Sequence, residues 1–445
     1  MIPITNSSID PALIFSSYSG SALDNWGNTA TFDSKGNLYS GGIVSGQFNQ
    51  VGFPTTAGAF QTKHANGSEW DIGILKYDSS GANLMYVTYL GGTGAETPQS
   101  FVVNENDELL VLGATSSPDF PGTTGNFKGG ETIDPIAGIL YDGGTDIFVA
   151  KFSADGSMLL HGTYLGGSGN DGINFVSGEL LDDHIESVLG KNYGDQLRGD
   201  ILTDAAGNVY ISTTTASLDF PVVNSDPNAN YHGGTHDAVV AMLASDLSVV
   251  WTRLLGGDST DAAYSIKLTD SGNVVAAGGT ASINLVGMNG QITAAPGQID
   301  GWIAILSPDG SQIINETYVG TNAYDQVYFI DVASNGDVVA YGQTKGHYPV
   351  SPGVYSNPNS GQFIHRFTAD LKSTVFSTVF GTGGRSPNIS PTAFLVSACD
   401  NIYVAGWGGS INSPDYWGGD ANYVGGDTFG LPVTADAISK KYFGS

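Results

Sequence analysis

An all-β fold built from repeated four-stranded antiparallel units is predicted by three observations. A strand-like segment ending in glycine occurs six times, a hairpin-like segment occurs six times, and another strand-like segment occurs five times. These segments lack helical periodicity and are rich in β-branched and aromatic residues. The turn residues of successive hairpins lie 71, 100, 65, 64 and 64 residues apart. A repeat of this length predicts one structural unit per copy, with insertions in the early copies.

Each hairpin consists of two apolar runs around a turn of Asp, Asn and Gly, as in TFDSKGNLYSGG at 31–42. Such turns require a residue with positive φ. Glycine holds that position in four copies, and aspartate, which tolerates this conformation better than most residues, holds it in two. The six turn residues are Gly36, Asp107, Gly207, Gly272, Gly336 and Asp400.

The glycine-ended segments read LMYVTYLGG at 84–92, LLHGTYLGG at 159–167 and VVWTRLLGG at 249–257. Looser copies lie at 13–21, 313–321 and 374–382. Residues 166–174 also fit the nonapeptide of calcium-binding β-rolls. A β-roll needs this nonapeptide in tandem, whereas it occurs here once, so the glycines are interpreted as the end of a strand.

The remaining strand opens with aspartate in four copies, at Asp71, Asp146, Asp237 and Asp300, and with Gly361 in the fifth. Because these acids recur at one position of the repeat, they are interpreted as architecture and not as catalysis. Hairpin, third strand and fourth strand together make the blade of a β-propeller. The sequence therefore predicts one six-bladed β-propeller domain over 1–445.

The blades are expected at 21–92, 93–167, 195–257, 258–320, 321–381 and 382–445. Loop insertions are expected at 128–143, 178–198 and 408–430; the second should hold a short helix at 182–189 and project from one face. The chain opens with a fourth-strand copy at 13–20, which should complete the last blade and protect its edge. Because the sixth blade lacks a third strand, the natural polypeptide is expected to continue.

Composition narrows the function. With 43 acidic and 15 basic residues, the net charge of −28 disfavours nucleic acid and anionic membranes as partners. It suits a secreted protein or one that collects divalent cations. A single cysteine, Cys399, excludes a disulfide within the chain. No 18-residue apolar run is present, so no membrane insertion is expected.

No catalytic constellation is found, so no catalytic residue and no cofactor are predicted. The segments at 152–159 and 306–313 resemble the Asp-box of sialidases but lack its spacing, and the chain has only four arginines. The turns at Asp33 and Asp204 could bind calcium, or each aspartate could accept hydrogen bonds from its own turn. The second is expected, with calcium binding at most weak and distributed. The alternative function is a carbohydrate-active enzyme, a glycosidase or lyase, with its site in the propeller channel.

The candidate binding residues are aromatic. Residues 406–432 form an irregular stretch containing Trp407, Tyr416, Trp417, Tyr423 and Phe429. These side chains either stack on sugars and anchor partners or roof the propeller end and pack on one another. In the two DFP segments, Asp119 and Asp219 are expected to bond backbone amides, and Phe120 and Phe220 to fill space between blades.

The repeats resemble those of the SBBP-repeat β-propeller family, whose units carry YSTYLGG, D-x-x-G-N-x-Y-V-x-G, SSxDFP and DAFVAK. The segments at 116–121 (SSPDFP) and 216–221 (ASLDFP) are close copies. More narrowly, 19–33 and 397–409 resemble the propeller region of large surface proteins of gliding bacteria that use type IX secretion.

The resemblance implies an extracellular or cell-surface protein, attached to the outer membrane of a Gram-negative gliding bacterium. It also implies a non-catalytic scaffold or binding module of a larger protein, in adhesion or gliding. The expected partners are other domains of the same polypeptide, other surface proteins or glycans.

Overall fold

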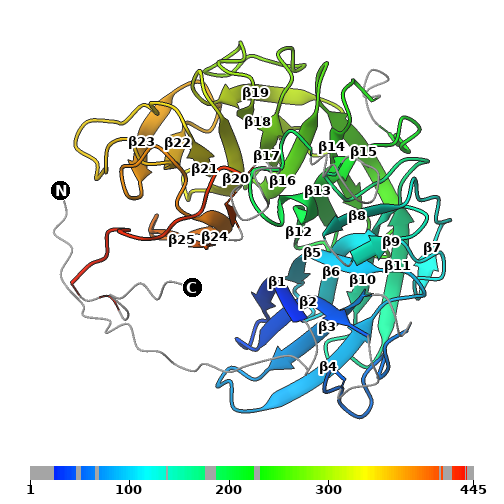
Figure 1. The fold of residues 1–445 in the computed structure, drawn as a ribbon. Coiled ribbons are helices and arrows are strands. Elements are labelled where there is room, and N and C mark those ends of the chain that lie inside the picture. Colours follow the sequence, from blue (N-terminus) through cyan, green and yellow to red (C-terminus); the bar gives the residue numbers. More distant parts are fainter. Residues whose placement is uncertain are drawn as a thin grey trace.

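The structure is a computed structural model that describes residues 25–46, 52–65, 70–136, 139–175, 187–224, 231–409, 412–413, 423–435 and 437. The described strands form seven sheets, and six of these follow one another around a ring, as Figure 1 shows. Neighbouring strands within each blade are antiparallel and hydrogen-bonded in chain order from the inside outwards. The chain is therefore a β-propeller of six blades, as the repeats predict.

The first three blades have four main strands each. Blade 1 contains β1 (Asn25–Phe32), β2 (Leu38–Ser45), β3 (Trp70–Tyr77) and β4 (Leu84–Leu90). Blade 2 contains β5 (Glu96–Val103), β6 (Leu109–Thr115), β10 (Asp146–Phe152) and β11 (Leu159–Leu165), with the short β7 (Thr123–Thr124) parallel to β11. Blade 3 contains β12 (Asp200–Thr203), β13 (Val209–Thr215), β14 (Asp237–Leu243) and β15 (Val249–Leu255).

Blades 4 and 5 repeat this pattern. Blade 4 contains β16 (Asp261–Leu268), β17 (Val274–Thr280), β18 (Asp300–Leu306) and β19 (Ile313–Val319). Blade 5 contains β20 (Asp325–Val332), β21 (Val338–Thr344), β22 (Gln362–Phe367) and β23 (Thr374–Phe380). Blade 6 contributes β24 (Ser390–Val396) and β25 (Ile402–Trp407) to the described residues. A separate hairpin, β8 (Ile133–Ile136) and β9 (Ile139–Tyr141), lies in the insertion of blade 2.

The local predictions from the hairpin turns are confirmed. Asp107 and Asp400 have φ of 59° and 58°, close to the 76° of Gly36 and the 80° of Gly207. The expected turn hydrogen bonds are also present: Asp33 accepts from the backbone N–H of Lys35 and Asn37. Asp204 accepts in the same way from Ala206 and Asn208, so the Asp33 and Asp204 carboxylates stabilise their own loops.

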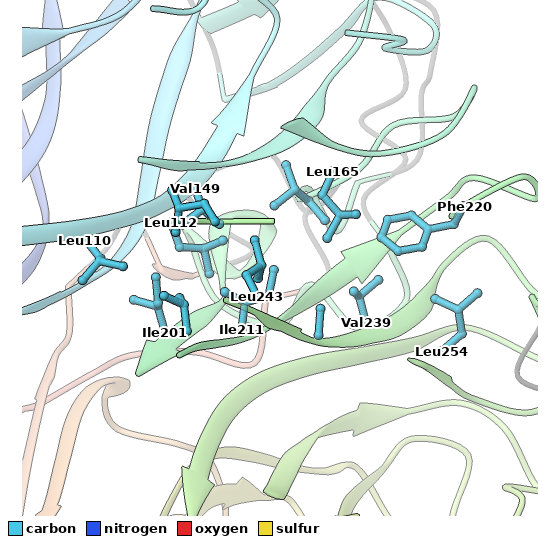
Figure 2. Close-up of a cluster of buried hydrophobic side chains, with 14 residues drawn as sticks. Leu110, Leu112, Val149, Leu165, Ile201, Ile211, Phe220, Val239, Leu243 and Leu254 are labelled. Atoms are coloured by element: carbon cyan, nitrogen blue, oxygen red, sulfur yellow. The ribbon is translucent and has the colours of Figure 1, made fainter. Parts of the chain in front are cut away.

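The core lies between neighbouring sheets. Figure 2 shows one such layer, where Leu110, Leu112 and Val149 of blade 2 face Ile201, Ile211 and Val239 of blade 3. Alternate residues of flat strands point to opposite faces, so each sheet contributes one face to each of its two neighbours. Phe220 belongs to this layer and Phe120 to the layer between blades 1 and 2. Both phenylalanines fill space between blades, as predicted.

Blade 6 leaves apolar side chains exposed on the described part of its sheet. Leu395, Tyr403 and Val404 are 55%, 56% and 39% exposed. Among the described residues, β25 pairs only with β24. The segment expected to complete this blade, 13–20, lies outside the described residues, so the closure of the ring remains a prediction from the repeat order.

Deleting residues 1–20 is expected to lower the melting temperature by several degrees and to promote aggregation through the freed sheet edge. The reason is that the fourth-strand copy at 13–20 supplies backbone partners and apolar cover for blade 6. Thermal unfolding and size-exclusion chromatography measure both effects. Deletion of residues 1–9, which spares the strand, is the control. A 1–20 deletion that melts like the full chain and stays monomeric would contradict the closure.

Candidate binding site at the centre of the propeller

A β-bulge interrupts the innermost strand of five blades at the same place. The register shifts in β1, β5, β16, β20 and β24, and each shift leaves one residue unpaired. A bulge re-aims the side chain of its extra residue. The bulged residues are Asn28, Gln99, Tyr264, Tyr328 and Thr392.

The connection from β11 to β12 enters this central region. The second of its two described parts, residues 187–199, is named here the central insertion. The side-chain amide of Gln326, on the inner strand of blade 5, donates to the carbonyl of Leu189 over 3.0 Å. The carbonyl of Lys191 accepts from the backbone N–H of Val424 over 2.9 Å. The central insertion thus contacts segments that are more than 130 residues away along the chain.

An ion pair lies within the central insertion. The short 3-10 helix η2 (Asp195–Leu197) sets Asp195 and Arg198 three residues apart, with Arg198 Nε 2.6 Å from Asp195 Oδ1. The other carboxylate oxygen accepts from the Tyr328 hydroxyl over 2.9 Å and from the backbone N–H of Asn192 over 2.8 Å. Asp195 is fully buried. Its charge is therefore compensated by a cation and by hydrogen bonds, as a buried carboxylate requires.

Arg198 ties the central insertion to two blades. Its guanidinium lies over the ring of Tyr328, 4.3 Å from the ring centre, and donates to the carbonyl of Pro391 in blade 6 over 3.1 Å. Burial lowers the pKa of Arg198, but the Asp195 carboxylate and its hydrogen bond raise it more, so the guanidinium pKa lies above its ordinary value. Arg198 is therefore a permanent cation at the centre of the ring.

Two bulged tyrosines stack beside this ion pair. The rings of Tyr264 and Tyr328 are 5.6 Å apart and nearly parallel. The Tyr264 hydroxyl donates to Gln326 Oε1 over 3.0 Å and accepts from the side-chain amide of Asn174. Burial raises the pKa of both tyrosines well above its ordinary value. Both phenols therefore remain neutral hydrogen-bond donors near neutral pH.

Amide side chains join the central insertion to β21 of blade 5 through Gln343 and to the C-terminal loop through Asn412. Gln343 Nε2 donates to Asn192 Oδ1 over 2.9 Å, and Asn192 Nδ2 donates back to Gln343 Oε1 over 3.0 Å. Asn412 also donates to Asn192 Oδ1, over 3.2 Å, and accepts from the backbone N–H of Tyr193 over 2.6 Å. Side-chain networks of this kind stabilise a single arrangement when their members are satisfied.

The structure brings two of the five predicted aromatic residues together. The ring of Tyr193 meets Trp407 edge-on at 6.2 Å and Tyr423 edge-on at 6.5 Å. Tyr423 is only 5% exposed, whereas Phe429 is 70% exposed. Tyr416 and Trp417 lie outside the described residues. Trp407 and Tyr423 therefore pack with other aromatic residues at the propeller end, and Phe429 alone of the described three presents most of its ring to solvent.

The DFP aspartates bond backbone amides, as predicted. Asp119 accepts from the backbone N–H and hydroxyl of Thr93 over 2.8 Å each. Asp219 accepts in the same way from Ser168, over 2.6 Å and 2.9 Å. Residues 166–174, which fit the β-roll nonapeptide, form the connection after β11 and bridge antiparallel to β13 through Asp171. The glycines at 166 and 167 end a strand, as interpreted from the sequence.

The prediction for the insertion at 178–198 is wrong in its described part. Residues 187–189 form a turn and not a helix, and the rest of the expected helix at 182–189 lies outside the described residues. The segment does not project from a face: Ser187, Leu189, Asn192 and Asp195 are fully buried. It turns inwards because Leu189 packs with Tyr264 and Tyr328, where apolar area is removed from water.

Sequence reasoning missed the tyrosines of this site, although a signal for them exists. Gln99, Tyr264 and Tyr328 each lie three residues after the first acid of their inner strand. Asn174 stands three residues after Asp171 in the same way. A column of large polar residues on strands that are otherwise apolar indicates a shared polar surface, here the centre of the ring.

The comparisons with known proteins concern only the fold. Neither a protein-family model nor a curated protein matches the chain. Among solved structures, the K499G mutant of NanB sialidase from Streptococcus pneumoniae is 9% identical with a TM-score of 0.43, covering 88% of this chain and 66% of its own. This chain thus spans about two thirds of the sialidase chain.

Two further structures are similar at the same level. A protein of unknown function from Dyadobacter fermentans is 12% identical, covers 84% of this chain and 88% of its own, and has a TM-score of 0.39. A member of the DUF4221 family from Bacteroides vulgatus is 9% identical, with 87% and 88% covered and a TM-score of 0.37. Such likenesses carry no inference about activity. No helix in the described ranges has the length and apolarity to cross a membrane.

Replacing Arg198 by Met is expected to lower the free energy of unfolding by about 3 kcal/mol or more, because it leaves the buried Asp195 carboxylate without its cation. The double variant D195N/R198M should lose markedly less. Chemical denaturation measures both values, with R385M as the control, since Arg385 is exposed and should matter by less than about 0.5 kcal/mol. A single variant no less stable than the double variant would contradict this role.

Proposed function

We propose that this chain is a non-catalytic scaffold or binding module of a larger secreted or surface-attached protein. One observation carries the proposal: the chain's own central insertion lies within the ring, and its charged and amide side chains are bonded to one another and to the two inner strands of blade 5 nearest the centre, β20 and β21. Within this insertion, Asp195 is the carboxylate best placed to act in catalysis, but both of its oxygens already accept hydrogen bonds. Catalysis needs a group free to meet substrate, and this carboxylate is engaged.

The binding function is assigned to the end of the propeller where the C-terminal loop lies. Phe429 offers an exposed ring, and Trp407, half-buried on Tyr193, lies at the end of β25. Aromatic rings held in place by neighbours bind sugars or partner proteins at low entropic cost. Tyr416 and Trp417 belong to the same loop by sequence and are included in the proposed surface. Tyr423 supports the loop from its buried position.

The proposed setting follows from the resemblance to SBBP-repeat propellers of gliding bacteria. A strongly acidic chain remains soluble and avoids nonspecific contact with anionic polymers. This agrees with a protein exposed at the cell surface or secreted, acting in adhesion or gliding beside other domains of its polypeptide. Glycans and surface proteins are the proposed partners.

A broad glycan panel, read for binding and for released products, tests the proposal. Binding without turnover is the expected outcome, and F429A should weaken it about tenfold or more because an exposed aromatic anchor is removed. The control is F32A, which removes an equally exposed phenylalanine at the far end of β1. Turnover of any glycan that the D195N variant abolishes would overturn the non-catalytic function in favour of a carbohydrate-active enzyme.

A further inference from the structure

Carboxylates from adjacent blades meet at four blade junctions. The acid near the start of the third strand of one blade faces an acid of the next blade, which lies at the start of the inner strand at three junctions and, as Asp171, in the connection before it at the fourth. All eight side chains are buried. The pairs are Asp71 with Glu96, Asp146 with Asp171, Asp237 with Asp261, and Asp300 with Asp325.

A glycine between each pair shows how close the two acids lie. A Cβ atom added to Gly256 would lie 2.7 Å from Asp237 Oδ1 and 2.7 Å from Asp261 Oδ2. At Gly320 the corresponding distances are 2.6 Å to Asp300 Oδ1 and 3.1 Å to Asp325 Oδ2. One oxygen of each carboxylate therefore packs against the same side of the glycine, where a Cβ would otherwise lie. Two like charges at such separation in a buried site repel each other strongly.

At three of the four junctions, an oxygen aimed into this space has no hydrogen-bond partner. The oxygens are Oδ1 of Asp71, Asp237 and Asp300. In contrast, both oxygens of Asp146 accept backbone N–H groups, from Gly129 and Lys128. A buried carboxylate oxygen without a partner is costly. Asp71, Asp237 and Asp300 thus lack the hydrogen-bond donor at Oδ1 that Asp146 obtains from the backbone of its own loop.

Protein cations do not supply the missing partner in the described part of the chain. The ion pairs found there place no lysine or arginine on any of the eight acids. Histidines approach two of them, with His64 Nδ1 3.6 Å from Asp71 Oδ2 and His232 Nδ1 3.5 Å from Asp237 Oδ2. Both histidines lie beside Oδ2, not beside the unpartnered Oδ1.

Backbone carbonyl oxygens surround the clearest of these sites. The Cβ position of Gly297 lies 3.2 Å from Asp300 Oδ1, 3.0 Å from the carbonyl oxygen of Thr321 and 2.6 Å from that of Ala323. Asp300 Oδ1 and two backbone carbonyl oxygens thus lie around one point beside Gly297. Hard divalent cations prefer such a set of carboxylate and carbonyl oxygens and complete their shell with water.

The junction between blades 5 and 6 provides an internal comparison. Beside Gly381 this junction holds the neutral amides Gln362 and Asn388, and Gly361 stands at the repeat position of the third-strand acids. Gln362 Oε1 accepts from the backbone N–H of Asn388, and Asn388 Nδ2 donates to the carbonyl of Asp427 over 2.8 Å. Without carboxylates, this junction satisfies itself. Unpartnered carboxylate oxygens are therefore found at three of the four junctions with acid pairs and not at the amide junction.

We propose that a divalent cation of the calcium class binds at each of three blade junctions, between Asp71 and Glu96, between Asp237 and Asp261, and between Asp300 and Asp325. Each cation matches the two negative charges of its pair and joins the third strand of one blade to the inner strand of the next. The sites do not depend on the binding function proposed above.

Metal analysis of the full chain tests this proposal. The protein is stripped with a chelator and dialysed against about 1 mM calcium chloride, in the range where extracellular calcium modules bind. About three calcium ions per chain are expected, together with a rise of several degrees in melting temperature. The double variant D300N/D325N, which copies the amide character of the last junction, should bind one ion fewer.

Two further variants keep the outcome decisive. D309N neutralises an exposed aspartate in the β18–β19 turn and should leave the ion count unchanged. D237N/D261N should lower the count by one if D300N/D325N does not fold. A chain that binds no calcium, or variants that keep the full count, would overturn the proposal. Failure here leaves the glycan-binding test untouched, because the two experiments concern different residues.

Discussion

The ring depends on a position that has no room for a side chain. In each of the first five blades, a glycine follows the outer strand and fills this position. Gly91 and Gly256 end β4 and β15 where acids from two blades converge, and a Cβ at either position would lie 2.5 Å to 2.7 Å from carboxylate oxygens of both blades. Any other residue would force these carboxylate side chains to shift. The same loops place their next N–H groups on the inner-strand acid, as Gly257 does on Asp261 over 2.8 Å. The repeated glycine pairs are therefore the places where blades are joined.

The junctions also explain how the centre is organised. Each junction fixes the start of an inner strand. The β-bulge that follows leaves one large residue out of the strand pairing, so that its side chain points elsewhere. Tyr264 and Tyr328 reach the central insertion in this way, so the Asp195–Arg198 pair is held by residues whose register the junctions set. Insertion, inner strands and C-terminal loop form one hydrogen-bonded unit. A scaffold that must present a loop rigidly benefits from such a closed centre.

Much of the fold could be predicted because the information is local and repeated. Turn chemistry identified the positive-φ residues down to Asp107 and Asp400, and strand patterns identified the blades. The centre could not be predicted in the same way, because Asn192 meets Gln343 only after the ring has formed. The third-strand acids could be found from the repeat, as residues at one position of the third strand. The acids that face them could not be predicted, because a pair such as Asp300 and Asp325 spans two blades and no single repeat contains both residues.

The junction constraint is tested most directly by the free energy of unfolding of G256A, measured by chemical denaturation beside G409A. Gly409 has open space where a Cβ would form, whereas at Gly256 the methyl group would collide with Asp237 and Asp261. The account predicts a loss of about 2–3 kcal/mol for G256A and a change of less than about 0.5 kcal/mol for G409A. Equal stability of the two variants would contradict it.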